Sequence, residues 1–168
     1  MHVDLAPDVS DLGVNSPLFT SQEDILWISE MRSRLDRLLP KKSILRDGRR
    51  NLEFLRTVHY ESLRAGLDPQ WVLAVIQVES AFRKYAISTA GARGYMQVMP
   101  FWVELIGSEH HSLFDLRTNL RYGTTILRHY LDIEQGDYFR ALGRYNGSLG
   151  QARYPNLVYR AWKKNWQP

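Results

Sequence analysis

Residues 75–100 read VIQVESAFRKYAISTAGARGYMQVMP, and their fifth residue, Glu79, is a carboxylate within what reads as a core helix. Asp68 can cap the first free amides of that helix, and Pro69 suits its first position because no N–H is needed there. Steps of three and four residues give its apolar face as Val72, Val75, Ile76, Glu79 and Phe82. The sequence therefore predicts a helix with a carboxyl group on its buried side.

Two interpretations of Glu79 follow from that position. Burying an unpaired ionised carboxylate is costly, so such a group either finds a partner or raises its pKa and keeps its proton. Glu79 is then either a structural glutamate paired with one of the arginines, or a proton donor of the kind that glycoside-cleaving enzymes use. The helix alone leaves both open.

Composition limits the classes of protein that this chain can represent. It has 168 residues, enough for one domain with a real core, and 44% hydrophobic with 24% charged residues is typical of a globular protein. It has no cysteine, which excludes disulfides and thiol nucleophiles. The net charge of +4 and a pI near 9.4 favour acidic partners, without indicating one.

No stretch approaches the roughly 20 apolar residues of a membrane span, so we expect none. The first 19 residues lack a basic region followed by an apolar one, so they do not read as a signal peptide. A cytoplasmic protein and a mature or trimmed exported form both remain open.

Helical periodicity dominates the rest of the chain. Residues 1–19 read as a loose arm, and residues 21–39 as an amphipathic helix that is followed by a basic connector, KKSILRDGRR. Further helices are predicted from about 49 to 65, from Asn119, from Asp137 and from near Pro155, with a short apolar segment after Pro100. No sustained alternation predicts a strand, apart from possible short pairings in STAGARGYMQ. We predict an all-α fold in which residues 1–48 extend a domain of residues 49–168.

The loop after Glu79 combines flexible backbone with side chains that suit a sugar. Gly91 and Gly94 permit conformations closed to other residues. The loop's hydroxyl, ring, amide and thioether groups match the mixture that a saccharide requires, and they belong to Ser88, Tyr95, Gln97 and Met99. Each has a structural explanation when it is taken alone, so it is their joint spacing behind Glu79 that indicates a sugar site.

Four stretches together resemble a known family, the soluble lytic transglycosylases, which cleave the glycan strands of peptidoglycan. They are ESAF (79–82), AISTAGARGYMQVMP (86–100), NLRYG (119–123) and ALGRYNGSLG (141–150). The resemblance covers about residues 51–166 and implies a lysozyme-like catalytic domain. Departures occur at Tyr95, at Phe101 and Trp102, and in residues 147–150, which puts the sugar subsites rather than the acid in question.

Matched by position, Glu79 corresponds to the family's catalytic acid and base. Ser88 corresponds to a serine near that carboxylate and the substrate's acetamido group, and Tyr145 to a tyrosine facing the glutamate, with Asn146 beside it. The resemblance implies that Gln97 and Met99 line the groove, and we expect Tyr95, Met96 and Met99 to keep water away from the sugar ring.

The resemblance implies a reaction with one carboxyl group and no cofactor. Glu79 would protonate the glycosidic oxygen between N-acetylmuramic acid and N-acetylglucosamine, and the acetamido group would stabilise the cation. Glu79 would then take the proton of the C6 hydroxyl, which closes on C1 to give a 1,6-anhydro sugar. Peptidoglycan would be the partner, and the cell envelope or periplasm the location.

Alternatives remain at this stage. A goose-type lysozyme would share fold and acid but use water, and a non-catalytic glycan-binding or secretion-apparatus component could dock a partner through the N-terminal helix. A nucleic-acid binder is disfavoured because the basic residues are scattered. His110 and His111 lack metal-ligand spacing, so no metal is expected. No spacing singles out a second catalytic carboxylate among Glu104, Asp115 and Asp132.

Overall fold

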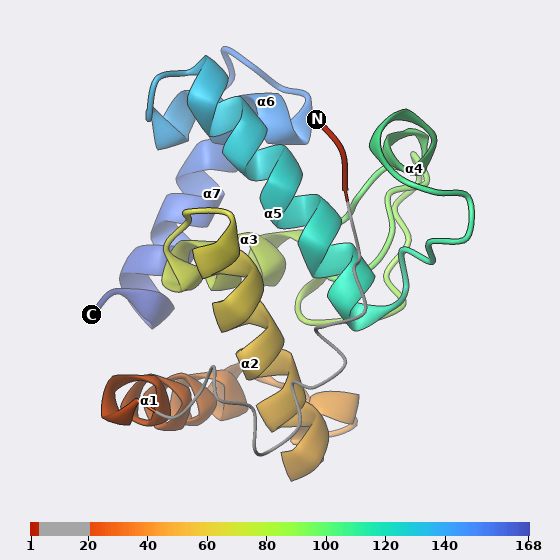
Figure 1. Cartoon of the computed structure of the whole chain (residues 1–168). Coiled ribbons are helices and arrows are strands. Elements are labelled where there is room, and N and C mark those ends of the chain that lie inside the picture. The colour runs from red at the N-terminus through yellow and green to blue at the C-terminus, as the bar shows by residue number, and fades with distance from the viewer. Residues whose placement is uncertain (4–20) are drawn as a thin grey trace.

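The computed structural model describes residues 1–3 and 21–168, so the predicted arm lies almost wholly outside the described residues. The described part is all-α, as predicted (Figure 1). Its helices are α1 (Gln22–Leu38), α2 (Gly48–Arg64), α3 (Pro69–Ser80), α4 (Phe101–Ile106), α5 (Leu116–Ile133), α6 (Tyr138–Asn146) and α7 (Arg153–Ala161). A 3-10 turn, η3 (Ile44–Arg46), precedes α2, and a π-helical turn, η4 (Trp162–Trp166), ends the fold.

The helix starts follow local capping chemistry. Ser21, Asp47, Asp68, Asp115 and Asp137 each accept a hydrogen bond from a backbone amide in the first turn of the helix that follows. The prediction that a helix begins at Asn119 was wrong by one turn. Asp115 caps α5 through Thr118 N at 2.9 Å, and Asn119 lies buried inside the helix.

The core gathers around α3, which runs through the middle of the helices (Figure 1). α3 contacts α2, α7 and η4, and its central residues Val72, Leu73, Ala74, Val75 and Ile76 are fully buried. A helix that is apolar on all sides belongs in a core. Because α3 is held from several sides, the residues at its carboxyl end have a fixed position.

α1 packs on the outside of this arrangement. Ile28, Met31 and Leu35 form its buried face, and it contacts α2 and η4. Arg34 donates to the Asn165 and Gln167 carbonyls at 3.2 and 2.7 Å. α1 is therefore docked on both α2 and the C-terminal segment.

The described residues contain no β-strand, only two isolated bridges. Arg93 pairs with both Ile87 and Val98, inside the loop for which short pairings were predicted. None of the helices within residues 1–3 and 21–168 is long and apolar enough to cross a bilayer.

Candidate active site

Glu79 lies in the last turn of α3, half-buried at the edge of the core. The chain then leaves the helix abruptly, because Ala81 and Phe82 both adopt left-handed backbone conformations, with φ of 49° and 61°. Such conformations are disfavoured for residues with a side chain and persist only where packing fixes them. Phe82 provides that packing: its ring contacts those of Phe54 and Trp166 at centroid distances of 6.1 and 5.9 Å.

The Glu79 carboxyl group meets a tyrosine from α7. Tyr154 Oη donates to Glu79 Oε1 at 2.5 Å. Burial raises the pKa of Glu79 from its ordinary value of 4.5 to about 7, and the Tyr154 hydrogen bond partly opposes the increase. Glu79 is therefore poised to hold a proton near neutral pH and to release it, which is what an acid that later acts as a base requires.

Tyr145 faces the same carboxyl group from α6. Burial raises the pKa of Tyr145 well above its ordinary value, and the Glu79 charge is the next largest cause. The Tyr145 hydroxyl donates to the Met96 carbonyl oxygen at 2.7 Å. Tyr145 thus connects α6 to the loop that follows Glu79, and lies within electrostatic reach of the acid.

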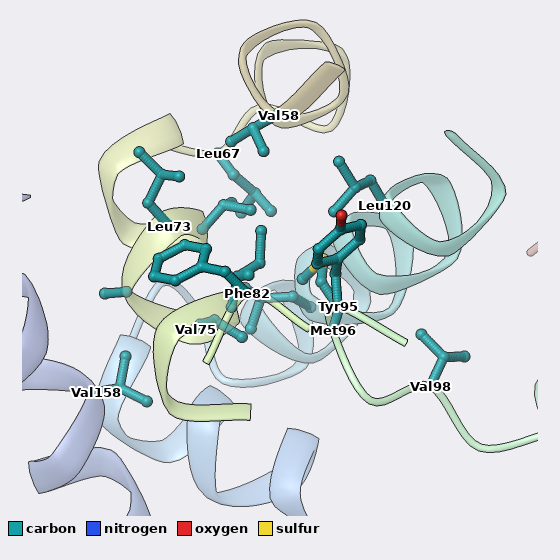
Figure 2. Packing of buried hydrophobic residues seen from close by; sticks show 14 of the residues in the cluster. Val58, Leu67, Leu73, Val75, Phe82, Tyr95, Met96, Val98, Leu120 and Val158 are labelled. Atoms are coloured by element: carbon teal, nitrogen blue, oxygen red, sulfur yellow. The ribbon is translucent and has the colours of Figure 1, made fainter. Parts of the chain in front are cut away.

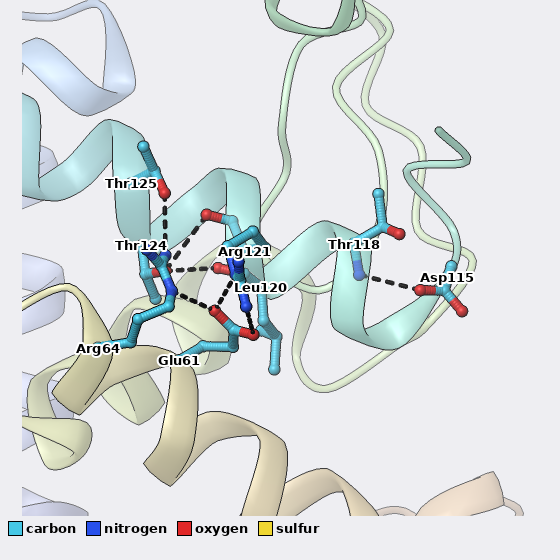
Figure 3. A network of polar contacts seen from close by, with 8 residues as sticks. All are labelled: Glu61, Arg64, Asp115, Thr118, Leu120, Arg121, Thr124 and Thr125. Atoms are coloured by element: carbon cyan, nitrogen blue, oxygen red, sulfur yellow. Dashed lines mark hydrogen bonds and ion pairs between the residues drawn. The ribbon is translucent and has the colours of Figure 1, made fainter. Parts of the chain in front are cut away.

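A second glutamate shows what a structural pairing looks like in this fold. Glu61 on α2 is fully buried, and Arg121 of α5 donates to both of its oxygens, Nε to Oε2 at 2.6 Å and the second nitrogen to Oε1 at 3.0 Å (Figure 3). Arg64 adds a bond to Oε2 at 2.7 Å. Glu79 forms no ion pair with the described residues. Of the two interpretations of Glu79, the geometry favours the proton donor.

Residues 86–99 fold into a compact loop stabilised by its own polar groups. Gln97, with φ of 53°, donates through its side-chain amide to the Ala86 and Gly94 carbonyls, both at 3.0 Å. The Ser88 hydroxyl accepts from the Ala92 amide at 3.0 Å. These bonds fix the loop and leave the Gln97 side-chain oxygen as an acceptor for a ligand.

The side chain of Asn119, on α5, holds the loop of residues 86–99 against that helix. Its side-chain oxygen accepts from the Met96 amide at 2.8 Å, and its nitrogen donates to the Arg93 and Leu113 carbonyls at 2.9 and 2.8 Å. Gly94 lies against this amide, where an added Cβ would come within 2.4 Å of the Asn119 nitrogen. Close approach, together with a φ of +75°, is why glycine occupies this position.

The structure places Tyr95 and Met96, which were expected beside the sugar ring to keep water away from it, in the core instead. Both side chains lie in the core (Figure 2), where the Tyr95 ring packs on Phe54 at 5.0 Å. Met96 fills the space over Gly123, where any Cβ would come within 2.3 Å of its sulfur. Asn119 binds the Met96 amide, which holds the loop backbone next to α5 with both apolar side chains directed into the core.

The other predicted site residues remain accessible. Ser88, Gln97 and Met99 are half-buried, and Asn146 is exposed at the end of α6, where it donates to Ser148 at 2.7 Å. Tyr154 was missed by the sequence analysis. It directly precedes Pro155 in the first turn of α7, and nothing in the local pattern separates it from a core tyrosine.

The candidate second carboxylates serve other purposes. Asp115 caps α5, Asp132 pairs with Arg128, and Glu104 is exposed on α4. His111 contacts the Tyr122 hydroxyl at 2.7 Å. Residues 1–3 and 21–168 hold no cluster of three or more metal-ligating side chains.

The chain that carries this site is similar to known proteins. The family described as Transglycosylase SLT domain matches residues 56–167. Because the match covers well over half of the chain, the protein belongs to this family.

Among curated proteins, the transglycosylase of Enterobacteria phage PRD1 is 34% identical over 103 residues, which cover 61% of this chain and 38% of that protein. Membrane-bound lytic murein transglycosylase C of Photorhabdus laumondii is 29% identical over 118 residues, with 58% and 32% covered. The chain thus spans about a third of the length of these relatives.

Among solved structures, an inactive mutant of lytic transglycosylase Slt from Pseudomonas aeruginosa is similar with a TM-score of 0.51 and 25% identity, over 63% of this chain and 20% of that one. The 70 kDa soluble lytic transglycosylase from Escherichia coli has a TM-score of 0.50 and 21% identity, with 66% and 20% covered. The fold is therefore that of the lysozyme-like lytic transglycosylases, as predicted.

Proposed function

We propose that this protein is a peptidoglycan lytic transglycosylase that cleaves the β-1,4 bond between N-acetylmuramic acid and N-acetylglucosamine. The observation that carries the proposal is the state of Glu79, whose pKa is raised to about 7 by burial and whose carboxyl group is held by Tyr154 rather than by a cation. Membership of the family and the names of its relatives supply the substrate class.

Glu79 acts twice in the proposed reaction. It first gives its proton to the glycosidic oxygen, while the substrate's acetamido group stabilises the cation at C1. The ionised Glu79 then takes the proton of the muramyl C6 hydroxyl, whose oxygen closes on C1 to form the 1,6-anhydro ring. Tyr154 stabilises the carboxylate between the two steps, because a hydrogen bond to the charged form favours that form.

The proposed groove wall consists of Ser88, Gln97, Met99, Tyr145 and Asn146. The Gln97 side-chain oxygen is available to a sugar hydroxyl, and the Met99 thioether offers an apolar contact. Tyr145 contributes by holding the loop in place, because its hydroxyl donates a hydrogen bond to the Met96 carbonyl oxygen.

An internal nucleophile fits this site better than water. The described residues place no second carboxylate in contact with Glu79, and a hydrolase of the two-carboxylate kind needs one to activate water. The C6 hydroxyl is part of the bound substrate, and intramolecular attack has a large effective molarity.

Digestion of purified sacculi in water enriched in ¹⁸O tests this proposal, with mass spectrometry of the released muropeptides. We expect 1,6-anhydromuramyl ends, one water lighter than hydrolysis products, and no uptake of label. Reducing muramyl ends that carry ¹⁸O would identify a lysozyme instead. A protein that binds sacculi but releases nothing would be a glycan-binding component.

The proposed place of action is the cell envelope or periplasm, where peptidoglycan lies. We also propose that residues 1–48 form an extension and that residues 49–168 form the catalytic domain. α1 exposes Ile25 and Leu26 beside its docked face, which would suit an envelope protein partner.

A further inference from the structure

A groove of about 640 Å³ lies directly beyond the catalytic helix. One wall is the basic connector, residues 40–44, and the other is residues 81–87, which begin two positions after Glu79. Its lining, as far as the described residues form it, contains the cations Lys42, Arg83 and Lys84 and no carboxylate. The wall that the connector supplies lies outside the family match, which begins at residue 56.

The groove and the candidate active site share one segment of chain. Ala86 lines the groove and also accepts the Gln97 side-chain amide at 3.0 Å, and Ile87 immediately precedes Ser88. The groove therefore lies beside the backbone that carries Ser88 and binds Gln97.

The cations of the groove are held in place. Arg83 donates through Nε to the Ser80 carbonyl at 3.0 Å, which ties it to the end of α3, and the Lys84 ammonium lies 5.3 Å from the centroid of the Tyr85 ring. Exposed apolar side chains lie between them, with Tyr85 67% and Ile87 64% exposed. Positive charge mixed with open apolar surface suits a flexible acidic peptide rather than a neutral sugar.

We propose that this groove binds the carboxylate-bearing peptide attached to muramic acid while the glycan strand lies against Glu79. The proposal rests on the proposed function, because it takes the substrate to be peptidoglycan. A neighbouring depression of about 280 Å³ shares Ile44, Lys84 and Tyr85, but its other charged residues are Arg50, Glu53 and Asp115. Its two carboxylates balance its two cations, so the groove with three cations and no carboxylate is the better site for the acidic groups of the peptide.

Binding rather than turnover is the direct test, measured by co-sedimentation of the Glu79→Gln protein with sacculi. Intact sacculi are compared with sacculi whose peptide carboxylates have been converted to amides, which keeps the cross-links and therefore the sedimenting particle. We expect tighter binding to intact sacculi. An exposed charge pair changes a binding constant by up to about fivefold and a reversal adds repulsion, so Lys42→Glu or Lys84→Glu should weaken that binding about three- to tenfold.

Lys41→Glu is the matched control, because Lys41 is an exposed neighbour with the same charge that does not line the groove. It should alter binding by less than about twofold, because an exposed charge that does not contact the ligand is screened by solvent and salt. Equal binding to intact and amidated sacculi, or an equal loss with Lys41→Glu, would overturn the groove assignment. Digestion of sacculi by the wild-type protein in ¹⁸O-enriched water tests the proposed function separately.

Discussion

At Glu79 the cost of burying charge, rather than a neighbouring charge, sets the state of the proton. The carboxyl group ends an apolar helix, and Tyr154 offers it one donor, which opposes the rise in pKa without cancelling it. Glu61, which is fully buried, is held by two guanidinium groups. The partner, not the burial alone, separates a proton donor from a structural ion pair.

Glu79→Gln should abolish lysis and change how stability depends on pH. Because folding raises the pKa of Glu79 from 4.5 to about 7, the protonated form stabilises the fold fully below about pH 4.5. That contribution, about 3 kcal/mol, is lost as the pH rises through 7. Urea unfolding at pH 4.5 and pH 8 should show a larger loss in the wild-type protein than in Glu79→Gln. Equal losses, or more than a few per cent of residual lysis, would place the acid elsewhere.

Tyr154→Phe should move the alkaline limb of the activity profile upward. The Tyr154 hydrogen bond lowers the pKa of Glu79, so its removal lets that pKa rise further. A bond to a charged group contributes about 1.5–3 kcal/mol, which corresponds to a shift of roughly one pH unit or more. The rate measured from pH 5 to 9 tests this. An unshifted limb with a uniformly lower rate would make Tyr154 a packing residue only.

At the scale of elements, the loop of residues 86–99 depends on α5 for its shape. Asn119 satisfies three backbone groups of the polypeptide that passes over it, while Gly94 and Gly123 leave room for the close contact. These hydrogen bonds and close contacts hold the loop backbone against α5. They explain why Tyr95 and Met96 are core residues and why Gln97 and Ser88 remain accessible.

Asn119→Ala should therefore destabilise the protein and lower lysis together. It leaves the Met96 amide and the Leu113 carbonyl without their partner, at about 1–3 kcal/mol for each buried group left unsatisfied, while the Arg93 carbonyl keeps its bond from the Val98 amide. Thermal unfolding and turbidity of a cell-wall suspension measure the two effects. Asn156→Ala, an exposed asparagine of α7, is the control and should change neither. Full stability in Asn119→Ala would contradict the anchoring role.

Over the whole molecule, α2 and α5 are joined across the core by the Glu61 network (Figure 3). Arg64 extends it to the Thr124 and Thr125 hydroxyls at 3.3 and 3.0 Å. Because α5 carries Asn119 and α2 packs on α3, this network fixes the loop relative to the acid.

Glu61→Ala should lower the free energy of unfolding by about 3–5 kcal/mol, because it leaves the buried Arg121 guanidinium without its carboxylate. Asp132→Ala removes an exposed carboxylate from its pair with Arg128 and should have an effect of less than about 1 kcal/mol. Denaturant titrations compare the two variants. Similar losses would show that burial of the Glu61 network does not matter.

The sequence by itself determined the helices and the position of the acid. Both depend on local rules: Asp68 and Asp137 cap the helices that were expected to begin there, and the three- and four-residue spacing placed Glu79 beside Val75 and Ile76. The glycines at 91 and 94 likewise indicated the compact loop. The resemblance carried by residues 79–150 supplied the family, which the match confirms.

Only the tertiary structure decided the partners of the acid and the direction of the loop's side chains. Tyr154 lies 75 positions from Glu79 and Asn119 lies 23 from Met96, so neither contact leaves a periodic signal in the chain. Tyrosine and methionine are residue types that can contact a sugar, but the direction of the Tyr95 and Met96 side chains depends on where α5 holds the backbone. The groove walls, residues 40–44 and 81–87, likewise meet only because η3 packs on α2 and α2 packs on α3. Spacing along a chain fixes what shares one helix face, whereas contacts between helices depend on how the whole core packs.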